Sequence, residues 1–191
     1  MNFVEPIKDL GKIEALKAIL RATPEYGLRD EALFVTGINT ALRVSDLLQL
    51  TVGDVLDNTG AFQEFITLKE KKTGKNKTFP LNDSIKKSLK AYLDSRGKAD
   101  PDEPLFMGKT GGSLTRVRAW QILNAAAQKI GLKHIGTHTL RKTFGYHAFQ
   151  RSKGNIALVQ KLLNHSSSGD TLRYIGIDQE EMNNTYLGLN L

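Results

Sequence analysis

Residues 40–48 read T-A-L-R-V-S-D-L-L and follow the stretch 29–39, whose apolar side chains predict a buried helix. A tight turn and a further short helix over 44–50 are expected next, so that Arg43 stands at the start of that helix. Asp46 lies one helical turn further on, where its carboxylate can fix the orientation of the guanidinium. An ordinary surface pair of arginine and aspartate has the same spacing. The segment therefore predicts a cation between two apolar surfaces and leaves its purpose open.

Helical periodicity continues on both sides of this segment. Start signals, stop signals and apolar spacing predict helices over residues 9–22, from 82 or 83 through 93, 115–130, 139–151 and 155–163, and short helical pieces after 169. Leu10 is assigned to the apolar face of the first, and Val117 and Trp120 to that of the third. Asp178 and Glu181 have the spacing of a capping pair.

Residues 61–80 have a different character. Apolar residues over 62–68, turn residues at 72–75 and the sequence T-F-P at 78–80 predict two antiparallel strands joined by a turn. The sequence D-N-T-G at 57–60 supplies a turn before them, so a small antiparallel β-meander is expected. The predicted fold class is α+β, a mostly helical domain with one small sheet.

The composition is that of a basic globular protein. The chain has 191 residues, 27 lysines and arginines against 20 acidic residues, a formal net charge of +7 and no cysteine. This excess favours an anionic partner such as nucleic acid. The absence of cysteine excludes disulfides and thiolate metal sites. No apolar run approaches the roughly 18 residues that span a bilayer, and no signal peptide is evident. We therefore expect a cytoplasmic protein, and no motif indicates a metal site or a P-loop.

The predicted turn between the strands is strongly basic. Residues 69–77 read K-E-K-K-T-G-K-N-K, which places five lysines and one acid at the tip of a hairpin. A basic hairpin can enter a DNA groove and contact phosphates. A solvated turn that keeps an edge strand soluble has the same composition. The lysines concerned are Lys69, Lys71, Lys72, Lys75 and Lys77.

Two further segments carry histidine, arginine and tyrosine. In residues 137–144, T-H-T-L-R-K-T-F, His138 and Arg141 lie three residues apart at a helix N-terminus, where the helix dipole also favours an anion such as a phosphate diester. A histidine cap with an exposed arginine is the simpler interpretation. His165 follows the end of a predicted helix and Tyr174 lies nine residues later, in places where such residues are usually structural. Each segment alone favours a structural role, and their combination does not.

The combination resembles the catalytic domain of the tyrosine recombinases, also called the phage integrase family. The first motif of the family is close to T-G-L-R-[VI]-S-E-L, and residues 40–47 read T-A-L-R-V-S-D-L. The H-x-L-R motif matches residues 138–141, and the L-G-H-S-S motif matches the sequence around His165. The family's tyrosine follows that histidine by nine residues, as Tyr174 does. Its lysine lies on a β-hairpin before a P-L return strand, and Lys72 occupies that position.

The resemblance covers about residues 7–175, nearly the whole chain. Its departures from the family pattern are small. Ala41 replaces the glycine of the first motif, and Asn164 replaces the glycine before the motif's histidine. Lys142 stands where many members have a second histidine. None of these changes removes a catalytic group.

The resemblance implies one catalytic domain over residues 1–175 with the tyrosine recombinase catalytic-domain fold, and a tail over 176–191. The additional N-terminal domain that most members carry is expected to be absent. The tail is rich in apolar side chains, so we expect it to dock onto a neighbouring protomer, as tails do in family members, or to fold back on its own domain.

The resemblance also implies a catalytic site, made of Arg43, Lys72, His138, Arg141, His165 and Tyr174. The tyrosine would attack a DNA phosphodiester to give a 3′-phosphotyrosyl intermediate, while the two arginines bind the non-bridging oxygens. His138 would accept the phenol proton, and His165 would hydrogen-bond the phosphate. Lys72 would protonate the departing 5′ oxygen, with its pKa lowered by the guanidinium charges. No cofactor is expected, neither a metal ion nor ATP.

The implied activity is site-specific recombination of double-stranded DNA, with a dimer on each site and a tetrameric synapse. The lysines expected to contact DNA are Lys69, Lys71, Lys75, Lys77 and Lys142. Two alternatives share the scaffold. A type IB topoisomerase uses the same chemistry to relax one duplex, and a non-catalytic DNA-binding regulator would not need Tyr174.

Overall fold

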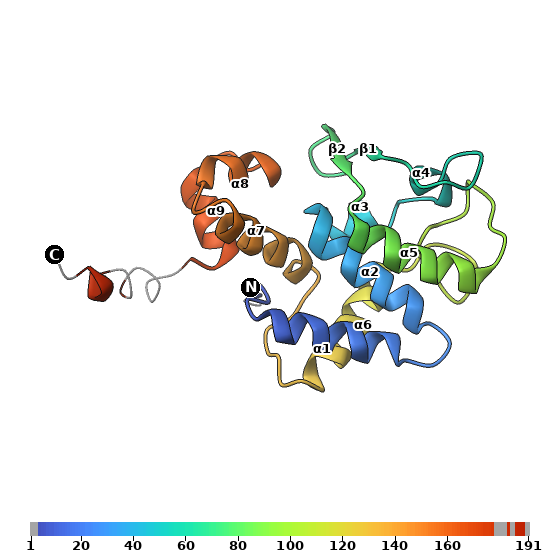
Figure 1. The fold of residues 1–191 in the computed structure, drawn as a ribbon, viewed down its shortest axis with the longest axis horizontal. Coiled ribbons are helices and arrows are strands. Elements are labelled where there is room, and N and C mark those ends of the chain that lie inside the picture. The colour runs from blue at the N-terminus through green and yellow to red at the C-terminus, as the bar shows by residue number, and fades with distance from the viewer. Residues whose placement is uncertain (1–3, 178–182, 184–185, 190–191) are drawn as a thin grey trace.

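The computed structural model describes residues 4–177, 183 and 186–189 (Figure 1). Within these residues the order of elements is α1 (Leu10–Arg21), α2 (Gly27–Thr40), α3 (Val44–Leu47), α4 (Val52–Val55), β1 (Phe65–Lys69), β2 (Asn76–Pro80), α5 (Asp83–Arg96), α6 (Arg116–Gln128), α7 (Thr139–Arg151), α8 (Ile156–Leu162) and α9 (Ser168–Ile175). The predicted α+β class with a helical majority is confirmed. The capping pair suggested for Asp178 and Glu181 lies outside the described residues.

Polar side chains fix where several helices begin. Asp9 accepts a hydrogen bond from the backbone N–H of Lys12 at the start of α1. Asn82, Thr115 and Ser167 cap α5, α6 and α9 in the same way. Each cap satisfies one of the N–H groups that the first turn of a helix leaves without a partner. Because these signals are local, the predicted helix starts agree closely with the structure.

The central helix is α2, which lies between α1 and α5 in Figure 1 and packs against both. Its Phe34 side chain is fully buried. Gly37 lets α7 approach closely, because a Cβ at this position would lie 2.5 Å from Cδ1 of Leu140. The motif that follows α2, with Arg43, is thereby held next to the helix that carries Arg141.

The sheet of the described residues is a two-stranded antiparallel hairpin, with Lys69 paired to Asn76 at its tip. Ile66, Leu68 and Phe79 turn inward and are buried against the helices. The expected meander is thus reduced to this hairpin and a single bridge between Leu56 and Phe62. The segment after Leu56 turns too early to form a full strand, since Asp57 accepts from the backbone of Thr59 and Ala61.

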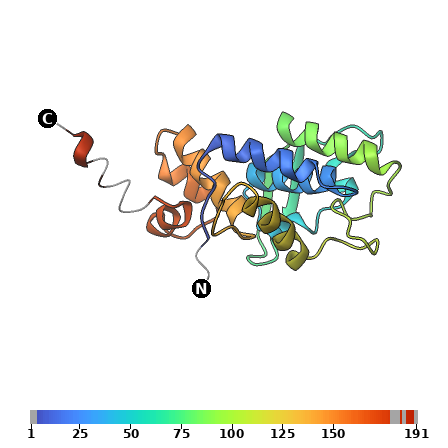
Figure 2. The same cartoon turned by 90° about the horizontal axis from the view of Figure 1, so that it is seen from below.

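Helices α7, α8 and α9 form a lobe at one end of the molecule (Figures 1 and 2). We call these three helices the lobe, and α1 to α6 with the hairpin the body. The lobe has a buried cluster distinct from that of the body, consisting of Ala41, Val159, Leu163 and Ile175. Gly145 allows close packing here, because a Cβ on it would lie 2.7 Å from Cγ2 of Ile175.

Three apolar positions differ from the prediction. Leu10 is 67% exposed, and Val117 and Trp120 are 63% and 43% exposed. Each lies at the N-terminal end of an apolar stripe whose later members are buried. Periodicity identifies the stripe, but it does not say where along the helix the neighbouring helix ends. Among the described residues, no helix is both long enough and apolar enough to cross a membrane.

Candidate active site

A cavity of about 770 Å³ opens where the body meets the lobe. Its wall includes all six residues of the predicted catalytic site: Arg43, Lys72, His138, Arg141, His165 and Tyr174. The other lining residues are Val4, Lys142, Asn164, Ser166, Asp170 and Arg173. Segments more than a hundred residues apart in the chain therefore meet in one hollow, which contains two arginines and a tyrosine.

Arg141 is the structural link between the body and the lobe. It is only 2% exposed and lies in the first turn of α7. Its Nη1 donates to the backbone oxygen of Ala41, 2.6 Å away at the end of α2, and its Nη2 donates to that of Leu163 at the end of α8. Two helix ends leave carbonyl groups without helical partners, and one guanidinium satisfies both. The simpler interpretation of an exposed arginine is therefore wrong.

The two residues that replace glycines of the family motifs each lie in the turn at the end of a helix, Ala41 after α2 and Asn164 after α8. Ala41 has φ 56° and Asn164 has φ 50°, so both adopt the left-handed conformation. Glycine enters this region freely, whereas asparagine tolerates it and alanine is strained. Burial of the Ala41 methyl and the bond to its carbonyl hold that residue in place. These two turns present the carbonyl groups of Ala41 and Leu163 toward Arg141.

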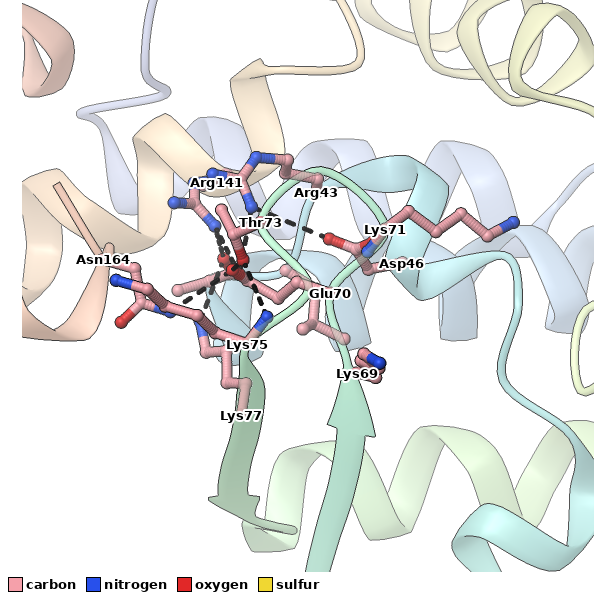
Figure 3. A network of polar contacts seen from close by, with 12 residues as sticks. Arg43, Asp46, Lys69, Glu70, Lys71, Thr73, Lys75, Lys77, Arg141 and Asn164 are labelled. Atoms are coloured by element: carbon pink, nitrogen blue, oxygen red, sulfur yellow. Dashed lines mark hydrogen bonds and ion pairs between the residues drawn. The ribbon is translucent and has the colours of Figure 1, made fainter.

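Arg43 is held from the protein side by two buried carboxylates (Figure 3). Its Nη1 lies 3.1 Å from Oε1 of Glu70 and 3.9 Å from Oδ2 of Asp46, and both acids have fully buried side chains. The other oxygen of Asp46 accepts from the backbone N–H of Lys71 at 2.9 Å. Arg43 and Asp46 are thus no surface pair, because they lie at the junction of the hairpin and α3.

Tyr174 lies on α9 between two histidines. Its Oη is 3.3 Å from Nδ1 of His138, at the start of α7. The ring of His165 meets the tyrosine ring edge-on, with centroids 4.8 Å apart. His165 is itself oriented by the hydroxyl of Thr171, 3.2 Å from its Nδ1. The phenol oxygen is therefore placed beside an imidazole nitrogen that can exchange a proton with it.

The cavity shifts the pKa of the tyrosine and the pKa values of the two histidines in opposite directions. Burial raises the pKa of Tyr174, against the opposing effect of the Arg141 and Arg43 charges. Partial burial and the charge of Arg141 lower the pKa of both His138 and His165. At neutral pH the phenol is consequently protonated and both imidazoles are neutral.

The predicted lysines occupy three kinds of position: the cavity wall, the exposed part of the hairpin and, for Lys77, the junction of the body and the lobe. Lys72 and Lys142 line the cavity, with Nζ of Lys142 5.2 Å from the centre of the Tyr174 ring. Burial lowers the pKa of Lys142. Lys69, Lys71 and Lys75 are exposed on the hairpin and lie outside the cavity wall.

Lys77 points into the protein. Its Nζ donates to the backbone oxygens of Ala41 and Leu162, each 3.2 Å away. Burial and the neighbouring charge of Arg141 lower its pKa to about 8. The tip of the hairpin therefore carries lysines directed to solvent, while its return strand carries one that is directed to the body–lobe junction.

Two polar residues of the site were not assigned a role from the sequence. In the sequence, Glu70 stands out only as the single acid among five lysines, and Asn164 only as the replacement of a family glycine. Their side chains meet, since Nδ2 of Asn164 donates to Oε2 of Glu70 at 3.3 Å. A single acid within a basic segment is a signal that the acid has a specific partner. The sequence does not identify the partners of Glu70, because most of them lie far away in the chain. Across the described residues, no cluster of three or more histidine and acidic side chains is placed to hold a metal ion.

The phage integrase family model matches residues 12–181. The chain belongs to the phage integrase family. It is 41% identical over 187 residues to a protein named probable integrase/recombinase YoeC of Bacillus subtilis, covering 97% of each chain. It is 31% identical to tyrosine recombinase XerC of Pelobacter propionicus, covering 93% of this chain and 57% of that relative. The chain thus spans nearly all of the first relative but little more than half of the second.

Solved structures of this family share the fold. The crystal structure of XerA recombinase matches 98% of this chain and 65% of its own, with a TM-score of 0.74 and 21% identity. XerH site-specific recombinase, bound to a palindromic difH substrate in a post-cleavage complex, matches 97% of this chain and 53% of its own. The TM-score there is 0.76 and the identity 22%. The tyrosine recombinase catalytic-domain fold expected from the motifs is confirmed.

Proposed function

We propose that this integrase-family chain cuts and rejoins DNA strands at specific sites through a covalent phosphotyrosine intermediate. The observation that carries the proposal is the placement of the Tyr174 hydroxyl, 3.3 Å from His138, in a cavity whose wall also contains Arg43 and Arg141. A nucleophile, a proton acceptor and two guanidinium groups are what phosphodiester attack requires.

The first step forms one bond and breaks another. The Tyr174 oxygen attacks the scissile phosphorus, and its proton passes to the neutral imidazole of His138. The bond from phosphorus to the 5′ oxygen breaks, and Lys72 donates a proton to that oxygen. The product is a 3′-phosphotyrosyl protein and a free 5′ hydroxyl. The reverse reaction, with a hydroxyl from another strand as the attacking group, rejoins DNA without an external energy source.

The two arginines stabilise the charge that develops during this step. Each guanidinium can donate paired hydrogen bonds to the non-bridging oxygens, where the pentacoordinate transition state gathers negative charge. Both are positioned before DNA arrives, Arg141 by two backbone carbonyls and Arg43 by two carboxylates. His165 supplies a further hydrogen bond to the phosphate from beside the nucleophile.

The partners of this reaction are double-stranded DNA and further copies of the chain. The exposed lysines Lys69, Lys71 and Lys75 contact phosphates from the hairpin beside the cavity, and Lys142 does so inside it. Proteins with this fold support the partner class, since the Tn1549 transposon integrase forms a complex with a circular intermediate DNA, and lambda integrase binds a COC′ core site as a dimer. As part of this proposal, we expect the chain to act in the cytoplasm, because its substrate is DNA.

The tail over residues 176–191 is proposed to bind a neighbouring protomer. In the described part of it, Tyr186 and Leu187 are each 77% exposed and Leu189 is 58% exposed. A shortened chain that ends at Asp178 should cleave single sites but fail to pair them. Unchanged pairing of sites in a gel-shift assay would show that the tail acts within its own chain.

The decisive experiment traps the covalent intermediate. The protein is incubated with a pool of nicked duplexes of varied sequence, in which the cleaved fragment diffuses away, and the adduct is separated on a denaturing gel. The modified peptide should map to Tyr174. Tyr174→Phe should give no adduct while its DNA affinity stays within about 3-fold of the wild-type value, because the ring is retained.

Tyr146→Phe is the matched control. Tyr146 also belongs to the lobe, but it packs against His147 and Lys8 and lies outside the cavity wall. It should form the adduct at the wild-type rate. A wild-type protein that binds DNA and forms no adduct on any duplex of the pool would favour the DNA-binding regulator. Adducts with relaxation of supercoils but no exchange between two sites would favour the topoisomerase.

A further inference from the structure

Glu70 is a buried acid at the centre of the site, 1% exposed, directly after the last residue of β1. Its Oε1 lies 3.1 Å from Nη1 of Arg43 and 3.8 Å from Nη1 of Arg141. One carboxylate oxygen therefore faces both guanidinium groups, as the converging dashed lines of Figure 3 show. The second carboxylate near this pair, Asp46, has an ion pair with Arg43 alone among the described contacts.

The second oxygen of Glu70 serves two other parts of the chain. Oε2 accepts from the hydroxyl of Thr73 at 2.7 Å, within the turn of the hairpin, and from the side-chain amide of Asn164 at 3.3 Å. The backbone N–H of Glu70 donates to the oxygen of Lys75 at 2.9 Å, which closes the same turn. The side chain thus joins the turn that carries Lys72 to the loop of the lobe that precedes His165.

Glu70 contacts the arginines from the protein side. It is absent from the cavity wall, whereas Arg43, Arg141 and Lys72 all line that wall. A phosphate in the cavity would therefore meet the guanidinium groups on their open side without displacing the carboxylate. Burial alone would raise the pKa of Glu70, but the Thr73 hydrogen bond and the charge of Arg43 outweigh it and lower the pKa. The group is consequently an anion at neutral pH and balances buried positive charge.

We propose that Glu70 is a positioning residue, which fixes the Lys72 turn and the two active-site arginines in one arrangement. This proposal deepens the proposed function and rests on it for its effect on catalysis. Its structural part concerns the free protein alone, because the contacts of Glu70 exist without DNA. Asn164 belongs to the same arrangement, since its amide is what ties the lobe loop to Glu70.

The first test measures the turn in the free protein. Trypsin cleaves after lysines, and Lys71, Lys72 and Lys75 lie in the exposed turn that Glu70 closes. Glu70→Gln keeps the shape but removes the charge, so cleavage at these lysines, followed by mass spectrometry under native conditions, should accelerate about 5-fold or more. Glu64→Gln is the matched control, because Glu64 is an exposed acid at the base of the same hairpin. It should leave the cleavage rate unchanged.

The second test measures chemistry on the duplex that the wild-type protein cleaves. At saturating protein, Glu70→Gln should form the covalent adduct at least about 10-fold more slowly, with a dissociation constant for DNA within about 3-fold of the wild-type value. A duplex with sulfur in place of the scissile 5′ oxygen has a leaving group that needs no proton. On this duplex the defect should shrink, because misplacement of Lys72 then matters less.

A second variant shows whether a slower reaction can be explained by loss of folding alone. Asn164→Gly removes the amide and suits the φ of 50° at this position, so it should stay folded and show a smaller slowing of about 3-fold. Wild-type rates of proteolysis and of adduct formation in Glu70→Gln would overturn the proposal. Adduct formation by Glu70→Gln that is slower only in proportion to the unfolded fraction of the protein would overturn the proposal as well. Absence of any adduct in the wild-type protein would refute the proposed function instead, while the proteolysis result would still decide whether Glu70 fixes the turn.

Discussion

The body and the lobe bury very different amounts of apolar surface. The core of the body extends through α1, α2, α5 and α6 and includes large side chains such as Phe34 and Phe106. The lobe's own cluster has four fully buried members, of which Ala41 comes from the body. Since apolar burial is the main stabilising contribution, we expect the lobe to unfold locally at a lower free energy than the body.

The catalytic residues are divided between these two regions. Arg43 and Lys72 come from the body, His165 and Tyr174 from the lobe, and Arg141 joins the two. The groups proposed to hold the phosphate are therefore shared between the two regions, with Arg43 on the body and Arg141 and His165 on the lobe, while the nucleophile lies on the part with the smaller core. A movement of the lobe would therefore change the phosphate site as well as the position of the attacking group, unless the bonds of Arg141 to both regions hold them together.

The largest expected effect comes from replacing the two arginines, which should slow the reaction alike but change the free energy of unfolding by different amounts. Arg141→Lys and Arg43→Lys should each slow adduct formation about 100-fold or more, because lysine cannot make the paired hydrogen bonds. Only Arg141→Lys also loses the bonds to the ends of α2 and α8. Its free energy of unfolding should fall by about 2–4 kcal/mol, and that of Arg43→Lys by less than about 1 kcal/mol. Thermal unfolding and single-turnover rates, measured side by side, provide the check. Equal losses of stability would show that Arg141 does not join the body to the lobe.

The second prediction concerns the proton acceptor. Partial burial and the charges of Arg141 and Lys142 lower the pKa of His138 below its ordinary value. A base must be neutral to accept a proton, so the rate of adduct formation should stay constant from pH 8 down past about 6.5 and then fall about tenfold per pH unit. His138→Ala should be slower at every pH and lack this fall, while His165→Ala should retain it. An inflection at pH 7 or above in the wild-type protein would contradict the assignment.

The sequence was sufficient for the framework and for the six predicted site residues, all of which lie in the cavity wall. Caps such as Asn82 and Thr115 act within one turn, and the motifs around Arg43, His138 and Tyr174 have characteristic spacings, so both could be predicted. The orientation of Lys77 could not be predicted, because alternation along a short strand does not say which partner lies across the junction.

Glu70 escaped prediction for a related reason. Its partners, Arg43, Arg141 and Asn164, come from three distant segments, and only the packing of the lobe on the body brings them together. The exposure of Leu10 and Trp120 likewise depends on where neighbouring helices end. Local rules thus predict elements and motifs, whereas charge compensation at a junction is a property of the assembled fold.

The third prediction uses two glycines to compare the interior of the lobe with its contact to the body. Gly145→Ala places a Cβ 2.7 Å from Ile175, next to Tyr174, and should cost about 1–3 kcal/mol of stability and slow adduct formation about 10-fold. Gly37→Ala meets the more flexible end of Leu140 at 2.5 Å and should cost less activity for a similar loss of stability. Gly169→Ala, in α9, would place a Cβ in ordinary contact with the Ser167 hydroxyl oxygen at 4.0 Å; it is the control and should be neutral or slightly stabilising. A larger loss of activity in Gly37→Ala than in Gly145→Ala would reverse the comparison.

The smallest expected effect lies at Lys77, which joins the body to the lobe through two carbonyl groups. Its pKa is about 8 in the folded chain, below the ordinary value of 10.5. Between these two pH values the unfolded chain binds more protons than the folded chain, so the free energy of unfolding should rise with pH across this window. The rise should be on the order of 1 kcal/mol, because the side chain is only partly buried.

Lys77→Met should lack the rise, and Lys75→Met, which removes an exposed charge from the same hairpin, should retain it. A wild-type stability that falls from pH 8 to pH 10 relative to Lys77→Met would mean that the charged ammonium is favoured at the junction, and that the body and lobe are held together by charge as well as by packing.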